Sequence, residues 1–212
     1  MNEPKAISRT ARAQLAKDPV LAKLIARYPD FDPRAWLAEL PKLDAFGALV
    51  FQVAGQQLSL RATRAIIDRL RALFRGKMPS PRQLLALPPA RLRKAGFSTR
   101  KVATLRALAR KFLRERLTLA KLKKLSDDDI MVLLTSVPGI GPWTVQGFLI
   151  IALNRADVVL PGDLALRRAI KAAYALDHLP SPDEVLKLAQ AWAPYRSLAT
   201  AYLFQSEFDA IL

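Results

Sequence analysis

The sequence contains no cysteine and only one histidine, His178. Without cysteine the chain can form no disulfide, no thiolate zinc site and no catalytic thiol, and a single histidine argues against histidine-centred catalysis. Charged residues interrupt every apolar run before it reaches the length of a membrane span. The N-terminal stretch MNEPKAISRTARAQLAKD lacks the apolar core of a secretory signal. We therefore expect a soluble, cytoplasmic protein without membrane contacts.

Acidic residues are scarce relative to basic ones. The chain has 34 Lys and Arg against 18 Asp and Glu, giving a net charge of +16. Such an excess predicts a polyanionic partner, with nucleic acid first among the candidates. The charge has an alternative explanation: the genome composition or the salt tolerance of the host could favour arginine.

Alternating patterns typical of strands are almost absent, apart from a short stretch at 158–160. Half of the 212 residues are hydrophobic, which is enough for one large domain or two small intertwined ones. Capping residues followed by apolar periodicity predict an all-α fold. The helices expected from these signals lie near 19–27, 33–40, 45–54, 60–74, 182–192 and 195–208.

The stretch from Leu133 to Arg168 carries the most specific signals. Apolar residues at helical spacing end near Val137, and Pro138-Gly139-Ile140-Gly141 then predicts a tight hairpin. Pro142 suits the first position of a second helix, which we expect to continue to about residue 153. A helix that begins after glycines exposes backbone N–H groups, so Gly139 and Gly141 are expected to bind a backbone phosphate.

A carboxylate follows this hairpin in the turn Leu160-Pro161-Gly162-Asp163. A fixed carboxylate can stabilise positive charge that develops on a sugar when an N-glycosidic bond breaks, and it can orient the attacking water. The alternative is a simple N-cap, because aspartate is favoured at helix starts. Both roles are compatible, since a cap also positions an acid.

Basic residues crowd the segment from Arg91 to Lys124, where only Glu115 opposes them. Ser98 or Thr99 is expected to cap a helix there, and its first N–H groups together with Arg100 and Lys101 predict a second phosphate-binding site. Much of the remaining charge in this segment is expected to be a solvated helix face.

The sequences VPGIGPWT and LPGDLALRR, with Asp163 22 residues after Gly141, resemble the helix-hairpin-helix DNA glycosylases. The similarity is closest to the alkyl-base branch, 3-methyladenine DNA glycosylase II, and extends from about Phe46 to Ser206. It implies a central helical bundle at 46–150 that holds a DNA-wedging loop and the hairpin. It also implies a second helical subdomain, formed by 1–45 and 151–212, that carries the catalytic Asp163, with a cleft for the base between the two.

The resemblance also implies roles for individual residues. Gln57, beside Gln56, falls at the position that wedges into DNA, and Tyr195 falls beside the bound base. Trp143 replaces the lysine with which bifunctional relatives form an imine, so no strand cleavage is expected, and its indole is expected in the base pocket. Gly147 and Leu164 stand where the best-known relative has tyrosines, which makes the expected pocket more open.

The hairpin residues Gly139, Ile140, Gly141 and Thr144 are expected to contact the DNA backbone. Relatives often bind a monovalent cation here, and the carbonyls of Val137 and Ile140 would hold Na⁺ or K⁺. No other cofactor is expected, and without cysteine the chain cannot carry the iron–sulfur cluster of another branch.

The sequence therefore predicts a monomeric, nucleoid-associated enzyme that acts on double-stranded DNA with damaged bases. It would extrude alkylated purines such as 3-methyladenine and 7-methylguanine and hydrolyse their glycosidic bonds with Asp163. Two alternatives stay open: a glycosylase for deaminated or mismatched bases, and a non-catalytic DNA-binding protein. Asp163 discriminates against the second, because pure binding needs no acid in that turn.

Overall fold

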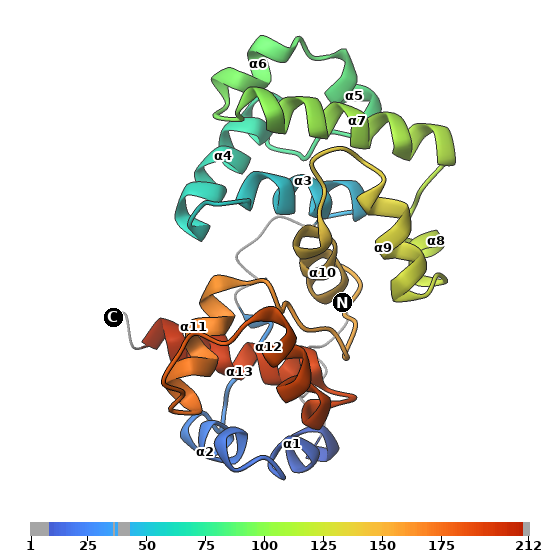
Figure 1. Cartoon of the computed structure of the whole chain (residues 1–212). Coiled ribbons are helices and arrows are strands. Elements are labelled where there is room, and N and C mark those ends of the chain that lie inside the picture. Colours follow the sequence, from blue (N-terminus) through green and yellow to red (C-terminus); the bar gives the residue numbers. More distant parts are fainter. Residues whose placement is uncertain (1–8, 36, 38–42, 210–212) are drawn as a thin grey trace. The chain divides into compact units, whose positions relative to one another are not determined.

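The computed structural model describes residues 9–35, 37 and 43–209. All regular structure in these ranges is helical and none of it is a strand, so the predicted all-α class is confirmed. The chain divides into two compact units (Figure 1): residues 1–40 with 155–212, called unit 1, and residues 41–154, called unit 2. In the part of the chain that is described, no helix is long and apolar enough to cross a membrane.

Unit 2 is built around a helix that is buried on all sides. This helix, α3 (Ala45–Gly55), buries every residue from Ala45 to Ala54, as expected of a helix enclosed by others. It packs against α4, α7 and α10 (Figure 1). The helices of unit 2 that follow α3 are α4 (Leu60–Ala72), α5 (Pro81–Ala86), α6 (Pro89–Lys94), α7 (Thr99–Glu115), α8 (Leu119–Lys123), α9 (Asp127–Thr135) and α10 (Pro142–Ile151).

Unit 1 joins the two ends of the chain. Its described helices are α1 (Arg9–Leu15), α2 (Pro19–Arg27), α11 (Leu164–Ala173), α12 (Pro182–Leu188), the 3₁₀ helix η2 (Ala189–Trp192) and α13 (Arg196–Asp209). Helix α13 packs against α2 and α11, so segments far apart in sequence share one core. Trp192 and Tyr202 are fully buried there, and Trp192 Nε1 donates to Tyr174 Oη at 3.2 Å.

Most predicted helix starts are confirmed because local side-chain caps determine them. Ser80 and Ser181 each form a reciprocal capping box with the residue three positions on, and Ser126 caps α9. The predicted helix at 182–192 is shorter, since α12 ends at Leu188 and the chain continues as η2. Of the helix predicted at 33–40, the structure describes only a turn and a short 3₁₀ segment, and the rest lies outside the described residues.

Candidate functional site

The hairpin between α9 and α10 has the conformation that its glycines allow. Gly139 has φ +88°, and a Cβ at this position would collide with Thr104 Oγ1, so only glycine fits. Gly141 is the N-cap of α10 and supplies no side-chain cap. Among the described residues, the backbone N–H groups of Gly139 and Gly141 have no hydrogen-bond acceptor. Two backbone donors at the positive end of a ten-residue helix suit an anion such as a phosphate.

Two other hairpin residues that are predicted to contact DNA make contacts within the protein. Thr144 is only 2% exposed, its Oγ1 accepts a hydrogen bond from Gln56, and its N–H donates to the Gly141 carbonyl at 3.0 Å. These groups hold the hairpin together, and the contact of Thr144 with the DNA backbone stays a prediction. The side chain of Ile140 is likewise buried in the core of unit 2, which leaves only its backbone for contacts outside.

The loop after α3 carries two glutamines with different environments. Gln56 Nε2 donates to the Gly139 carbonyl at 3.0 Å and to Thr144 Oγ1 at 2.9 Å. Its amide is thus fixed on the hairpin, whereas the assignment of Gln56 to the wedge stays a prediction. Gln57 is exposed and adopts a left-handed conformation with φ +57°. Leu58, which follows it, is 44% exposed, so the loop presents Gln57 next to an apolar side chain.

Lys101 makes internal contacts that were not predicted from the sequence. Its Nζ donates to the carbonyls of Ala54 and Gln56, both at 2.8 Å. Burial lowers the pKa of this ammonium, consistent with a group partly withdrawn from water. These carbonyls lie at the C-terminal end of α3, where backbone acceptors lack helical partners and a cation is favoured. Lys101 therefore anchors the loop that carries Gln57.

The start of α7 keeps the other features of the predicted phosphate site. Ser98 is the N-cap, and its Oγ accepts the N–H of Lys101 at 3.2 Å. Ser98 and Arg100 are exposed, so Arg100 is the cation available to an anion at this helix start. The cap itself was predicted and is confirmed, whereas contact with phosphate stays a prediction.

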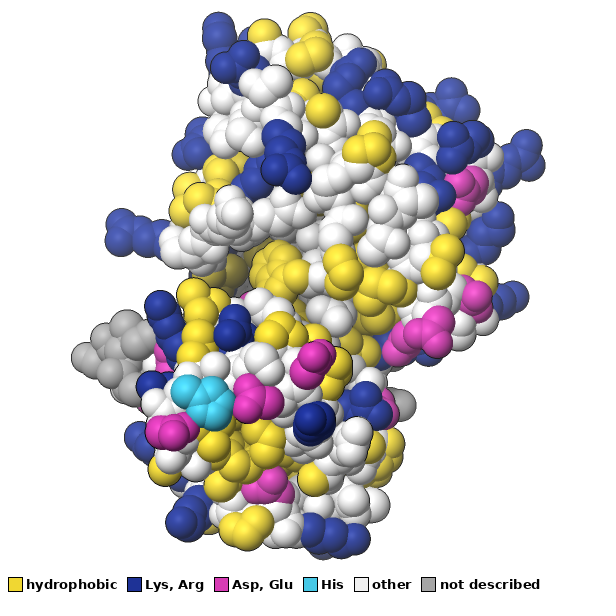
Figure 2. Space-filling view, viewed as in Figure 1, with side chains coloured by type: hydrophobic (Ala, Val, Ile, Leu, Met, Phe, Trp, Pro, Cys, Tyr) yellow, Lys and Arg dark blue, Asp and Glu magenta, His cyan; other side chains and the backbone are white. Residues whose placement is uncertain are grey.

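Not all of the basic side chains of unit 2 are available to a ligand. Lys and Arg side chains are spread over much of its visible face (Figure 2). Some of them are nevertheless used internally: Arg106 donates to the carbonyls of Leu85 and Leu87, and Lys111 is buried and pairs with Glu115 at 2.9 Å. The exposed remainder supplies the positive field that a polyanion requires.

Asp163 is the N-cap of α11 in unit 1. Its Oδ1 accepts the N–H of Leu166 at 2.9 Å, and its own N–H donates to the Leu160 carbonyl at 3.0 Å. The capping role recognised in the sequence is therefore confirmed. The cap fixes the orientation of the carboxylate. A carboxylate held in this way can act on a developing cation or on a water.

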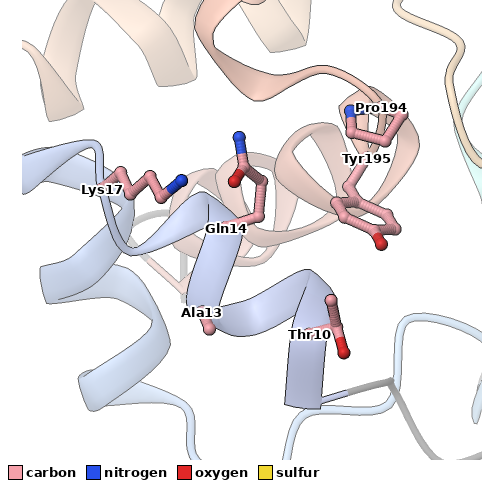
Figure 3. Close-up of a pocket in the computed structure, with 6 residues that line it drawn as sticks. All are labelled: Thr10, Ala13, Gln14, Lys17, Pro194 and Tyr195. Atoms are coloured by element: carbon pink, nitrogen blue, oxygen red, sulfur yellow. The ribbon is translucent and has the colours of Figure 1, made fainter.

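The two aromatic candidates lie in different units. Trp143 is half-buried in the first turn of α10, in unit 2. Tyr195 is half-buried in unit 1 and lines an open pocket of about 400 Å³ with Thr10, Ala13, Gln14, Lys17 and Pro194. Its ring lies opposite the side chains that α1 contributes to this pocket (Figure 3). Trp192, close to Tyr195 in the sequence, belongs instead to the buried core.

The hairpin carbonyls are compatible with a monovalent cation. The Val137 carbonyl accepts the N–H of Ile140 at 3.0 Å and retains a second lone pair. The Ile140 carbonyl accepts no hydrogen bond from another described residue. Two carbonyl oxygens in one turn are ligands of the kind that Na⁺ and K⁺ take. Within the described residues, no group of carboxylate and imidazole side chains is arranged so that it could hold a metal ion.

A helical protein with a glycine hairpin at a helix start and a capped aspartate beyond it is of the helix-hairpin-helix class. Residues 50–194 match the HhH-GPD superfamily of base excision DNA repair proteins, and the chain belongs to this family. The family expected from the hairpin and the PGD turn is thus confirmed.

Individual relatives agree with this assignment. The chain is 32% identical over 169 residues to DNA-3-methyladenine glycosylase 1 of Schizosaccharomyces pombe, covering 79% of this chain and 74% of that protein. It is 34% identical over 157 residues to a putative DNA-3-methyladenine glycosylase of Bacillus subtilis, covering 71% of this chain but only 55% of the relative.

Solved structures give the same result. The 3-methyladenine DNA glycosylase of Schizosaccharomyces pombe in complex with abasic DNA superposes with a TM-score of 0.87 at 30% identity, covering 94% of this chain and 97% of that one. A DNA-3-methyladenine glycosidase from Bacillus halodurans superposes with a TM-score of 0.70 at 29% identity, covering 91% and 90% of the two chains.

Proposed function

We propose that the protein is a monofunctional DNA glycosylase that removes alkylated purines, of the 3-methyladenine and 7-methylguanine type, in base excision repair. The observation that carries the proposal is Asp163, held by its cap at the start of α11, 22 residues beyond the hairpin. A cap alone would also account for an aspartate there, so the match of residues 50–194 to base excision DNA repair proteins adds the second support for a catalytic role. The names of the relatives, which include DNA-3-methyladenine glycosylases, support the same substrate class.

The protein acts on duplex DNA as a monomer, in the cytoplasm at the nucleoid. The N–H groups of Gly139 and Gly141, and the α7 start with Arg100, bind backbone phosphates without regard to sequence. A Na⁺ or K⁺ held by the carbonyls of Val137 and Ile140 would add positive charge beside the hairpin. Gln57 fills the gap that the extruded nucleotide leaves in the duplex. The base of the extruded nucleotide is contacted by Trp143 and Tyr195.

The chemical step is a hydrolysis. Alkylation at N3 or N7 makes the base cationic, so it leaves with the electron pair of the glycosidic bond and becomes neutral without needing an added proton. Asp163 stabilises the positive charge that develops on the sugar. Water then adds to the sugar carbon, and its proton passes to the carboxylate. Trp143 cannot form an imine, so the strand is left intact.

Product analysis tests this proposal. The protein is incubated with randomly methylated DNA, and released bases are identified by mass spectrometry; we expect 3-methyladenine and 7-methylguanine and no covalent adduct after borohydride treatment. Duplexes that contain uracil or a mismatch are assayed in parallel, and base release from these without release of alkylpurines from the methylated DNA would identify a glycosylase of another specificity. Binding without any released base would identify a non-catalytic protein, and a trapped adduct would contradict the monofunctional mechanism.

A further inference from the structure

A single polar side chain interrupts the apolar sequence of α3. Gln52 stands in AFGALVFQVAG, and only 6% of its surface is exposed. No hydrogen bond joins its side-chain amide to any other described residue. Neither amide atom is among the fully buried side-chain polar atoms that lack a partner, so the amide keeps access to solvent, and its place in a helix that is otherwise apolar needs an explanation. One explanation is a partner that is not part of the chain.

The amide of Gln52 occupies a space that a glycine of α10 leaves open. A Cβ at Gly147 would lie 2.6 Å from Gln52 Oε1 and 3.2 Å from its Nε2. Gly147 lies inside α10 and does not adopt a positive φ, so the backbone conformation does not require glycine there. Glycine weakens a helix interior, and the reason for it at this position is the space it gives to the amide.

This space lies beside the candidate base-binding tryptophan. Trp143 and Gly147 are one turn apart on α10 and therefore share a face. Side chains on a helix lean toward its N-terminus, so the space over Gly147 lies along the turn that begins at Trp143. One turn away from the Gln52–Gly147 contact, Gln56 donates to Thr144 Oγ1. The segment that begins with α3 and helix α10 therefore face each other at this point as well.

We propose that Gln52 is a specificity-determining residue that recognises the edge of the extruded purine; this inference rests on the proposed glycosylase function. A glutamine amide pairs with adenine by accepting from the N6 amino group and donating to N7. Adenine methylated at N3 keeps both groups. Guanine methylated at N7 has lost the N7 acceptor and carries a carbonyl at position 6. Gln52 therefore favours N3-alkyladenine over N7-alkylguanine.

The experiment measures single-turnover release of 3-methyladenine and 7-methylguanine from the same methylated duplex. Gln52→Met keeps a side chain of similar length without the amide, and Gly147→Ala displaces an intact amide from its position. Gln190→Met, at an exposed site in unit 1, is the matched control. We expect both test variants to lower the ratio of 3-methyladenine to 7-methylguanine release by roughly tenfold, the order of one bidentate base contact. The control keeps the ratio of the unmodified protein.

Thermal unfolding separates recognition from structure. Because Gln52→Met replaces an amide that bonds to no other described residue with an apolar side chain of similar length, its melting temperature is expected to stay about equal. An unchanged release ratio in both variants, or an equal fall in the two rates, would overturn the assignment of Gln52. Failure of the unmodified protein to release any alkylpurine would instead overturn the proposed function.

Discussion

The side-chain amide of Gln56 donates to the carbonyl of Gly139 at 3.0 Å and so ties the loop after α3 to the hairpin. Lys101 holds the other side of this loop through the carbonyls of Ala54 and Gln56. Gln57 therefore sits on a loop that is fixed at both sides to elements predicted to bind phosphate. In the proposed mechanism, a wedge held in this way needs little further ordering when DNA is bound.

Lys101→Met tests the anchoring role. Removing an ammonium that donates to two carbonyls leaves those acceptors unpaired, and hydrogen bonds to charged groups contribute about 1.5–3 kcal/mol each. We expect excision to slow by about tenfold while the salt dependence of binding to undamaged duplex is unchanged. The matched control is Lys94→Met, at an exposed site at the end of α6. A shallower salt slope for Lys101→Met would show instead that Lys101 contacts a phosphate, as the sequence predicts.

Arg100→Ala tests the phosphate site at the start of α7. Each phosphate neutralised by a cation releases condensed counterions and contributes about −0.9 to the slope of log K against log salt. The slope should become shallower by about that amount, equally for all sequences. Arg82→Ala, at an exposed arginine of α5, serves as the comparison. An unchanged slope for Arg100→Ala would place the phosphate contacts elsewhere in unit 2.

Gln57→Ala tests the wedge. A wedge acts after the phosphates are engaged, so the salt slope should stay the same while excision from a fully paired lesion slows by about tenfold. The loss should be smaller when the lesion lies opposite a mismatched base, because extrusion then costs less. Single-turnover rates on the two duplexes measure this difference. If the rate on the paired lesion did not change, the loop would be an ordinary turn.

The elements that could be predicted from sequence are those determined by neighbours along the chain. Ser98 and Asp163 each cap a helix through a backbone N–H three residues on, and such a signal is visible in the sequence itself. The contacts of Lys101 and Gln56 connect residues 45 to 88 positions apart. The sequence marks them as a cation and an amide, but their partners depend on how α3, α7 and the hairpin pack.

The buried amide of Gln52 illustrates the same limit. Its position in an apolar run is visible in the sequence, whereas its contact with Gly147 arises only from the packing of α3 on α10. The sequence alone therefore indicates that α3 carries a polar side chain among apolar ones. It does not indicate which residue of another helix this side chain contacts.

Asp163→Asn tests the central claim most directly. Asparagine caps helices about as well as aspartate, so α11 should still begin at Leu164, and DNA affinity should be largely retained. The amide cannot stabilise the developing sugar cation or accept the proton of the attacking water. We expect release of 3-methyladenine to fall below a tenth of the unmodified rate, an increase in the barrier of more than ~1.4 kcal/mol. Release at more than a tenth of that rate, with DNA binding intact, would show that another group performs the chemistry.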